Sequence, residues 1–389
     1  MSVPVAVTGI GVLSGFGHGV ERFWRALVAG ESGLGPSRRF AAPPGAPPVA
    51  EVPAVEARDH VRSALGRRID RVSLFTLAAC RLALLDAGLD AASLPVARTG
   101  LALGSEFGNL DETAAYLDRL FARGTANPLL FPNLVMNAPL SYTSIELGLT
   151  GPSAMLSSGD VSGEAAVAWG AELVAEERTD VCLAGGADEL CEALYRAFHE
   201  SRRMSATPRP FDLRADGFAL GEGAAVLVLE PVGRARARGA RVYARLVPVA
   251  GFALPAPVHG WPREEALLAA RLAPVVADAD AVVAAASGDP ALDALEAGAL
   301  AGAPAARTAL VTAPRAATGR FGAAGALAAA TAALAVAHDL VPPTSGHVPP
   351  ARHGLPVVAG RARATRVQVA VVDALARGGA CRPLRFEAP

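Results

Sequence analysis

Residues 157–163 (SSGDVSG) are the stretch of the chain whose residue types most suggest chemistry. They follow an apolar run (SAMLSSG) and precede a run with helical spacing (EAAVAWGAELVAEE), an order typical of turns that carry a nucleophile. The turn residue is Asp160, flanked by Ser158 and Ser162. A serine nucleophile needs a base and an acid–base aspartate needs a second group, and the neighbouring sequence offers neither. We therefore expect Asp160 to act as an N-cap, which stabilises a helix by roughly 0.3–1 kcal/mol.

The segments around this turn alternate between short apolar runs and runs with helical spacing. The apolar runs lack polar alternation, which favours strands of a sheet that is buried on both faces. Strands are predicted at residues 3–9, 99–105, 153–158, 179–187 and 218–230. Helices are predicted near residues 67–87, at 110–123, through 141–149 and at 164–177.

The same order begins again at about residue 241. Strands are predicted at residues 241–254, 280–287, 307–313, 367–375 and 381–387, and helices at 263–277, 291–302 and 322–337. Two halves of similar order indicate an α/β fold built from a duplicated unit. We place the halves at residues 1–240 and 241–389.

Composition narrows the class of protein. The 389 residues are 52% hydrophobic and 19% charged, which is typical of a chain with a large buried core. The net charge is −1, and because the chain has no lysine all 36 basic residues are arginine. This balance gives no reason to expect a nucleic acid or a membrane surface as partner.

Other sequence signals are weak. The four cysteines have no metal-binding spacing, and the glycines of residues 216–224 lack the context of a dinucleotide site, so we expect no metal and no cofactor. The Ala-rich run at residues 322–337 is shorter than the roughly 20 residues of a membrane span, so we expect a buried helix. The N-terminal residues lack the pattern of a signal peptide, and we expect a cytoplasmic protein.

Several long motifs resemble, in the right order, those of the β-ketoacyl synthase family. The motifs are VTGIGVLSGFGHGVERFWRALVAGESGLGP, LFPNLVMNAPLSYTSIELGLTGP, DVCLAGGADE and RPFDLRADGFALGEGAAVLVLE. The resemblance covers essentially the whole chain. It implies a thiolase-like fold with two duplicated halves and a five-layered α-β-α-β-α architecture.

The resemblance also implies three catalytic positions for decarboxylative condensation. In that family a cysteine at the N-terminus of a buried helix accepts an acyl chain, and two histidines assist the loss of CO2. The helix terminus favours a thiolate and an oxyanion. Here the cysteine position falls on Asp160, the first histidine position on Ala285 in AAASGDPALDALE, and the second on Arg320 in APRAATGRFGAAG. The catalytic Cys-His-His set is therefore predicted to be missing.

Loss of all three residues resembles one branch of the family, the chain length factor or ketosynthase-β subunit of type II polyketide synthases. That branch has TGR where the enzymes have TGH, as in Thr318-Gly319-Arg320. Asp160 differs from the glutamine that is typical of the branch. A carboxylate is a poorer acceptor for a thioester-borne chain than a thiolate, so no catalytic role is implied for this chain itself.

A chain length factor implies two partners, a ketosynthase-α in a heterodimer and an acyl carrier protein that bears the growing chain. The chain grows in a tunnel along the interface, and the resemblance puts Leu110, Thr113 and Leu117 in its wall. Their i, i+3, i+7 spacing places them on one helical face. Apolar residues at this spacing usually belong to a core, which is the alternative. Because leucine and threonine are smaller than aromatic residues, we expect a medium or long chain to fit.

Other interpretations stay open at this point. The chain can act alone, as an acyltransferase or malonyl decarboxylase that uses Asp160 or a serine, or as a structural homodimer. Arg320 can pair with Asp160 across the degenerate site, which would avoid leaving either charge alone. The arginines of residues 233–245 can form a solvated helix face or receive an acidic carrier protein.

Overall fold

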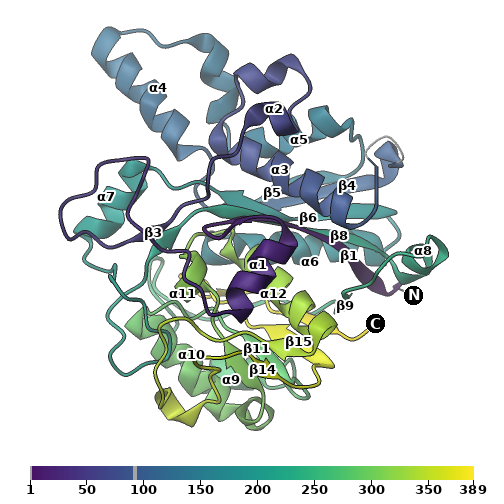
Figure 1. The fold of residues 1–389 in the computed structure, drawn as a ribbon, viewed down its shortest axis with the longest axis vertical. Coiled ribbons are helices and arrows are strands. Elements are labelled where there is room, and N and C mark those ends of the chain that lie inside the picture. The colour runs from purple at the N-terminus through teal and green to yellow at the C-terminus, as the bar shows by residue number, and fades with distance from the viewer. Residues whose placement is uncertain (1, 91–93) are drawn as a thin grey trace.

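A long sheet runs through the computed structural model, which describes residues 2–90 and 94–389 (Figure 1). Within these residues eleven strands form the sheet, in the order β12-β11-β15-β17-β9-β1-β8-β6-β4-β5, with β2 paired to β1. The strands of its N-terminal part are β1 Val5–Ser14, β2 Gly17–His18, β4 Thr99–Gly104, β5 Ser153–Leu156, β6 Val181–Asp188 and β8 Gly223–Pro231. Those of its C-terminal part are β9 Ala244–Val247, β11 Ala281–Val283, β12 Leu310–Thr312, β15 Val369–Val372 and β17 Leu384–Glu387.

The pairing pattern of the sheet occurs twice. From β1 outwards, β8 and β6 pair antiparallel and β4 and β5 then pair parallel. From β9 outwards, β17 and β15 pair antiparallel and β11 and β12 then pair parallel. The two parts meet where β1 pairs antiparallel with β9, Val5 opposite Leu246. This repetition confirms the predicted duplicated fold, while the division between residues 240 and 241 stays a prediction.

Helices cover the sheet in layers (Figure 1). The outer layer on the N-terminal part contains α3 Arg71–Asp86, which packs against β1, β8 and β6. The middle layer contains α6 Ser162–Ala175 and α12 Ala324–His338, and α12 contacts both β8 and β15. The other outer layer contains α9 Glu265–Leu272 and α10 Pro290–Gly302. The five predicted layers are therefore present.

The remaining elements are short or lie at the edges of these layers. The helices are α1 Val20–Val28, α2 Ala57–His60, α4 Leu110–Arg123, α5 Ala138–Leu147, α7 Glu192–Glu200, α8 Val232–Ala237 and α11 Arg315–Thr318. The 3-10 helices are η1 Ala64–Arg67, η3 Val96–Arg98, η4 Pro128–Leu134, η5 Gly159–Val161, η6 Pro304–Arg307 and η7 Arg352–Gly354. Small pairs are formed by β3 Val49–Ala50 with β7 Leu220–Gly221, β10 Phe252–Ala253 with β16 Ala380–Cys381, and β13 Leu340–Val341 with β14 Arg363–Ala364.

The Ala-rich helix α12 has no polar face because sheet strands lie on both sides of it. Its residues 324–336 are all buried, as predicted for a helix without an exposed side. Small side chains also let α6 and α12 approach closely. A Cβ at Gly163 would lie 2.6 Å from the backbone nitrogen of Ala326, so only glycine fits there.

Predicted boundaries are accurate where a local signal ends the element. The helix predicted at residues 110–123 has those bounds, because Gly124 follows in the left-handed conformation (φ 69°). The helix predicted near residues 67–87 begins instead at Arg71, because the Asp70 carboxylate accepts the backbone N–H of Ser73 at 2.9 Å and caps it. The strand predicted at residues 241–254 is interrupted, and only β9 and the short β10 form.

Candidate functional site

Asp160 lies in η5, immediately before the buried helix α6. Its side chain is 3% exposed. The residue before the first helical turn of α6 is Val161, and Asp160 caps neither helix with its side chain. The predicted N-cap role is therefore wrong. The Ser162 side chain bonds the backbone of this turn instead, since its hydroxyl accepts the backbone N–H of Ser158 at 3.0 Å and donates to the carbonyl of Gly159 at 2.7 Å.

Arg320 pairs with Asp160, as the sequence interpretation allowed. Its guanidinium donates to Asp160 Oδ1, and both side chains are buried. The backbone is held by Arg320 N–H donating to the carbonyl of Ala219 at 2.8 Å, just after Gly319 adopts φ 75°. The guanidinium also lies 4.8 Å from the ring centroid of Phe218, a cation–π distance.

Arg377 is a second cation on the same carboxylate. It comes from the loop between β15 and β16, and its backbone N–H and its Nε each donate to Asp160 Oδ2 at 3.0 Å. Its Nη2 also donates to Glu106 Oε1 at 3.0 Å. Glu106, Asp160, Arg320 and Arg377 therefore form one group of two anions and two cations, which we call the charge quartet. Asp160 and Arg320 are buried, and Glu106 and Arg377 are partly buried.

The charges of the quartet set the pKa values within it. Burial alone raises the pKa of Asp160, but Arg320 and Arg377 outweigh burial and hold that pKa well below its usual range. Burial, followed by the negative charge of Asp160, raises the pKa of Glu106 to about 7. Asp160 is thus a carboxylate with both oxygens committed to guanidinium groups, which makes it a poor nucleophile and a poor base.

Asp188, at the end of β6, positions the backbone beside the quartet. Its Oδ1 accepts the backbone N–H groups of Glu106 and Phe107, each at 3.0 Å, and its Oδ2 accepts that of Ala323 at 2.7 Å. Burial raises its pKa to about 6. One side chain therefore fixes the Glu106 segment against the start of α12.

Ala285, the first predicted histidine position, is buried just after β11 and has no contact with the quartet through its methyl group, which packs with an apolar cluster that includes Trp261. Its backbone connects it to the site. The Ala285 carbonyl accepts from Arg315 Nη1 at 3.3 Å, and Arg315 Nη2 donates to Glu164 Oε1 at 3.0 Å. Because Glu164 lies in the first turn of α6, Arg315 connects the Ala285 segment to the helix that follows Asp160.

The three positions that the family resemblance assigns to catalysis hold neither a cysteine nor a histidine. The four cysteines are buried, and burial raises the pKa of the Cys182 and Cys381 thiols to about 12, so neither is a thiolate near neutral pH. The two predicted histidine positions hold a methyl group and a paired guanidinium. In the part of the chain that the structure describes, no group of three or more metal-ligating side chains could hold a metal ion.

Leu110, Thr113 and Leu117 lie on one helix, as predicted, and of the three only Leu110 packs against a buried core cluster. Helix α4 has no buried residue, and Leu117 is 42% exposed. The backbone N–H of Asp111 donates to Glu189 Oε1 at 3.0 Å, which ties the start of α4 to the segment after β6. The helix extends away from the layered body (Figure 1). The alternative that this face belongs to a core therefore holds in part for Leu110, which packs against a buried cluster that includes Tyr195 and Phe218, and is wrong for the exposed Leu117.

The arginines of residues 233–245 are largely paired within the chain. Arg234 and Arg238 both donate to the buried Glu230, and Arg241 donates to Asp86 at 2.7 Å. Arg245 donates to Glu387 at 3.0 Å. These pairs leave little free positive charge for an acidic partner at this segment.

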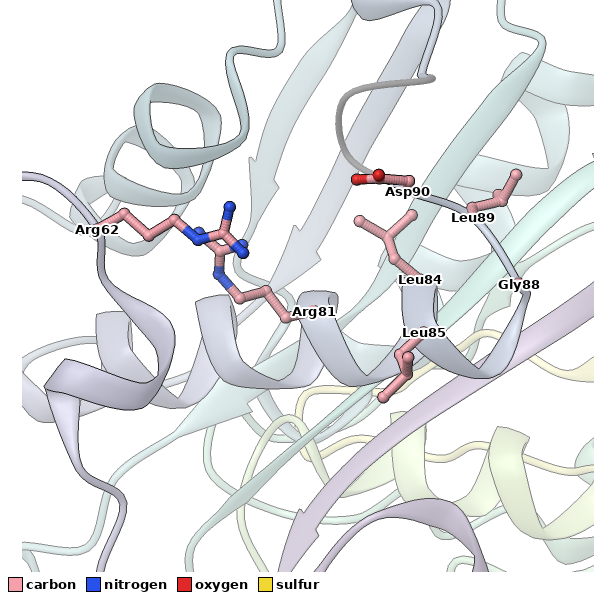
Figure 2. Close-up of a pocket in the computed structure, with 7 residues that line it drawn as sticks. All are labelled: Arg62, Arg81, Leu84, Leu85, Gly88, Leu89 and Asp90. Carbon is pink, nitrogen blue, oxygen red and sulfur yellow. The ribbon is translucent and has the colours of Figure 1, made fainter.

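A separate pocket of about 430 Å³ lies beside the C-terminal end of α3 (Figure 2). The guanidinium groups of Arg62 and Arg81 lie side by side at one end of it, and Leu84 and Asp90 lie toward the other. Arg81 also donates to the carbonyl of His60 at 2.6 Å. No residue of the charge quartet lines this pocket, so it is distinct from the degenerate site.

Comparison with known proteins assigns the family. The chain matches the N-terminal domain of beta-ketoacyl synthases over residues 2–235 and their C-terminal domain over residues 263–347. It belongs to the β-ketoacyl synthase family. It is 35% identical to the tetracenomycin polyketide synthase ketoacyl synthase beta subunit of Streptomyces glaucescens, over 97% of this chain and 96% of the relative.

Two further relatives, one a solved structure, agree with this family assignment. The solved ishigamide ketosynthase/chain length factor superposes with a TM-score of 0.91 over the whole of both chains, at 26% identity. The 3-oxoacyl-[acyl-carrier-protein] synthase 2 of Synechocystis is 30% identical over 98% of this chain and 97% of its own. The predicted resemblance to chain length factors of polyketide synthases is confirmed. Separately, no helix within residues 2–90 and 94–389 is long and apolar enough to cross a membrane.

Sequence reasoning missed Arg377 and Glu106. Neither has a motif of its own, and they lie 217 and 54 residues from Asp160 along the chain. The one available signal was indirect, since Arg377 immediately precedes the Gly378-Gly379 turn that was expected to join the closing strands. An arginine at such a turn gives no indication of which carboxylate it will meet.

Proposed function

We propose that this chain is a non-catalytic chain length factor that pairs with a ketosynthase-α and helps to set the length of a polyketide. The charge quartet carries this proposal. A condensing centre needs a nucleophile that can be acylated, and here the nucleophile position holds a carboxylate engaged by Arg320 and Arg377. Two guanidinium groups and the Phe218 ring occupy the space in which an acyl chain would be attached.

The surface of the chain supports a large partner. Of the thirteen exposed large apolar side chains among the described residues, eight lie between residues 117 and 145. They include Leu117, Leu120 and Phe121 of α4, Leu129 and Phe131 of η4, and Ile145 of α5. Such a patch on a folded chain is typical of a protein–protein interface.

The edge of the sheet adds to this surface. Strand β5 is the last strand of the N-terminal part, and within residues 2–90 and 94–389 it pairs only with β4, so its other edge can accept a strand from a partner. The patch and this edge adjoin in sequence, because α5 ends at Leu147 and β5 begins at Ser153. We propose that the ketosynthase-α covers both.

In the proposed pair Leu110, Thr113 and Leu117 line the tunnel for the growing chain. The exposed face of α4 is open to a partner, and the Thr113 hydroxyl is already satisfied by donating to the carbonyl of Asn109 at 3.0 Å. With this hydroxyl bonded to the backbone, the Thr113 side chain presents mainly its methyl group to a partner. The acyl carrier protein would transfer the growing chain to the partner's cysteine, because this chain has no acceptor for it.

Co-expression with a cysteine-containing ketosynthase from a neighbouring reading frame tests the proposal. We expect a stable one-to-one complex that makes polyketide from malonyl carrier protein, and no turnover by this chain alone. Turnover by the purified chain would support the enzyme alternative, and a homodimer that ignores the ketosynthase would support the scaffold alternative. Either outcome would overturn the proposal.

The tunnel assignment has its own test. In the reconstituted pair, Leu110→Trp and Leu117→Trp should shorten the main product, because an indole fills space that the leucine leaves free. Arg119→Trp, on the same helix outside the proposed wall, is the control and should leave product length unchanged. Products of wild-type length from both leucine variants would refute the role of these positions while leaving the heterodimer in place.

A further inference from the structure

Two buried carboxyl groups share one backbone donor at Ala285. The Ala285 N–H donates to Glu296 Oε1 at 2.7 Å and to Asp373 Oδ1 at 3.0 Å. Both acidic side chains have no solvent exposure. The second oxygens, Glu296 Oε2 and Asp373 Oδ2, are buried and have no hydrogen-bonding partner among the described residues. Because the bonded oxygens both lie about 3 Å from one nitrogen, the two carboxyl groups adjoin each other.

The surroundings cannot support two negative charges here. The nearest cation, Arg315, is committed to Glu164 at 3.0 Å and to the carbonyl of Ala285. Two adjacent buried carboxylates without a cation of their own are strongly unfavourable, and such pairs retain a proton. Burial, followed by the charge of Asp373, raises the pKa of Glu296 well above its ordinary value. Burial also raises the pKa of Asp373.

We propose that Glu296 and Asp373 share one proton in the folded chain, and that this proton holds the Ala285 segment between α10 and the segment that follows β15. One carboxyl group donates its O–H to the carboxylate of the other, and the N–H of Ala285 is divided between them. Loss of the proton leaves two carboxylates that repel each other. The Ala285 segment then loosens, together with its contact to Arg315 and, through Glu164, to α6.

Other titratable groups face the pair from each neighbouring element. They are Asp293 on α10, Arg315 on α11, Glu164 on α6 and Cys381 on β16. Asp293 accepts the backbone N–H groups of Phe211, Ser287 and Gly288, and burial raises its pKa to about 7 despite these donors. Arg315 is the only cation among these four groups, and it also serves Glu164.

The sign of the pH dependence follows from the raised pKa. The stabilisation is fully present below the pKa of an unfolded acidic side chain, about 4. It decreases as the pH rises through the folded pKa, because over that range the folded chain holds a proton that the unfolded chain has lost. The pair therefore makes folding take up one proton near neutral pH.

Two amide variants test whether the proton is shared. In Glu296→Gln or Asp373→Asn the amide N–H₂ replaces the carboxyl O–H, and the amide oxygen can still accept from Ala285. Urea unfolding midpoints between about pH 5 and about pH 9 give the number of protons taken up on folding. We expect each variant to lower that number by one relative to the wild-type chain. Glu172→Gln, at a half-exposed pair with Arg382, is the control and should leave it unchanged.

Three results would overturn the proposal. They are an unchanged proton uptake in both variants, a loss in only one of them, which would assign the proton to a single residue, and a loss of less than one proton. If either variant fails to fold, infrared spectra of the wild-type chain in D₂O decide the matter. A protonated carboxyl band must persist at about pH 9 and disappear on unfolding, and its absence would refute the shared proton.

Discussion

Replacing Asp160 with alanine should reveal how strongly the charge quartet holds the degenerate site together. The carboxylate accepts from Arg320 and from three donors of Arg377, at 3.0, 3.0 and 3.3 Å for the Arg377 contacts. Its removal leaves two guanidinium groups, that of Arg320 almost fully buried, with Glu106 as their remaining anion. Removing one partner of a buried ion pair typically costs about 3–5 kcal/mol, a large share of the 5–15 kcal/mol that stabilises a domain.

Urea unfolding followed by circular dichroism measures this loss. Linear extrapolation gives the free energy of unfolding, and an unchanged slope shows that the variant unfolds by the same transition. Asp180→Ala is the matched control, because it removes the same side chain from a partly exposed ion pair with Arg98 at 2.8 Å. Exposed pairs contribute about 0–1 kcal/mol, so the control should lose no more than that.

A double variant separates the pair from its surroundings. Asp160→Ala combined with Arg320→Ala should lose less than the sum of the two single losses, with an interaction energy of about 0.5–3 kcal/mol. If Asp160→Ala loses less than about 1 kcal/mol, as the control does, the argument that the quartet is a buried structural pairing fails.

Three further outcomes are expected. On acidification below about pH 4 the wild-type chain should lose more stability than Asp160→Ala does. The depressed pKa of Asp160 stabilises the fold above the unfolded pKa, and this stabilisation is lost as the pH falls through the folded pKa. Equal losses in the two chains would contradict the low pKa of Asp160. Gly325→Ala should lower the midpoint temperature of unfolding by several degrees, because the new Cβ would lie 1.7 Å from the Glu164 carboxylate. Gly233→Ala is the control and should leave the midpoint nearly unchanged, because no atom lies within 4 Å of its Cβ position. Similar midpoints for the two variants would contradict the packing argument. The Phe121 side chain is 83% exposed, so Phe121→Ser should change the free energy of unfolding by less than about 0.5 kcal/mol. The same variant should weaken binding of the ketosynthase in a pull-down titration. Full binding would exclude the apolar patch at residues 117–145 from the interface.

Local patterns account for most of the secondary structure. Unalternated apolar runs predicted strands buried on both faces, and β1, β4 and β6 are fully buried along their lengths. The Ala-rich run predicted a buried helix and α12 is one. These features depend on side chains a few residues apart, so a short window of sequence contains the information.

The degenerate site divides differently. The sequence alone determined that no cysteine and no histidine stands at the three positions that the family resemblance assigns to catalysis, and that Arg320 was a possible partner for Asp160. It misjudged Asp160 as an N-cap, because that preference is local and the stronger interaction came from a distant cation. Arg377 and Glu106 complete the quartet from 217 residues after and 54 residues before Asp160.

Only the tertiary structure decided which charges meet. Asp160 and Arg377 meet because α6 packs against α12 and because the chain returns between β15 and β16. The Asp188 carboxylate accepts the backbone N–H of Glu106 and fixes Glu106 beside them. The same packing joins Ala285, Glu296 and Asp373. Once water is excluded, a buried charge must find an opposite charge or keep its proton. Which of these happens depends on distances between segments that are far apart in the chain, and local sequence patterns do not encode those distances.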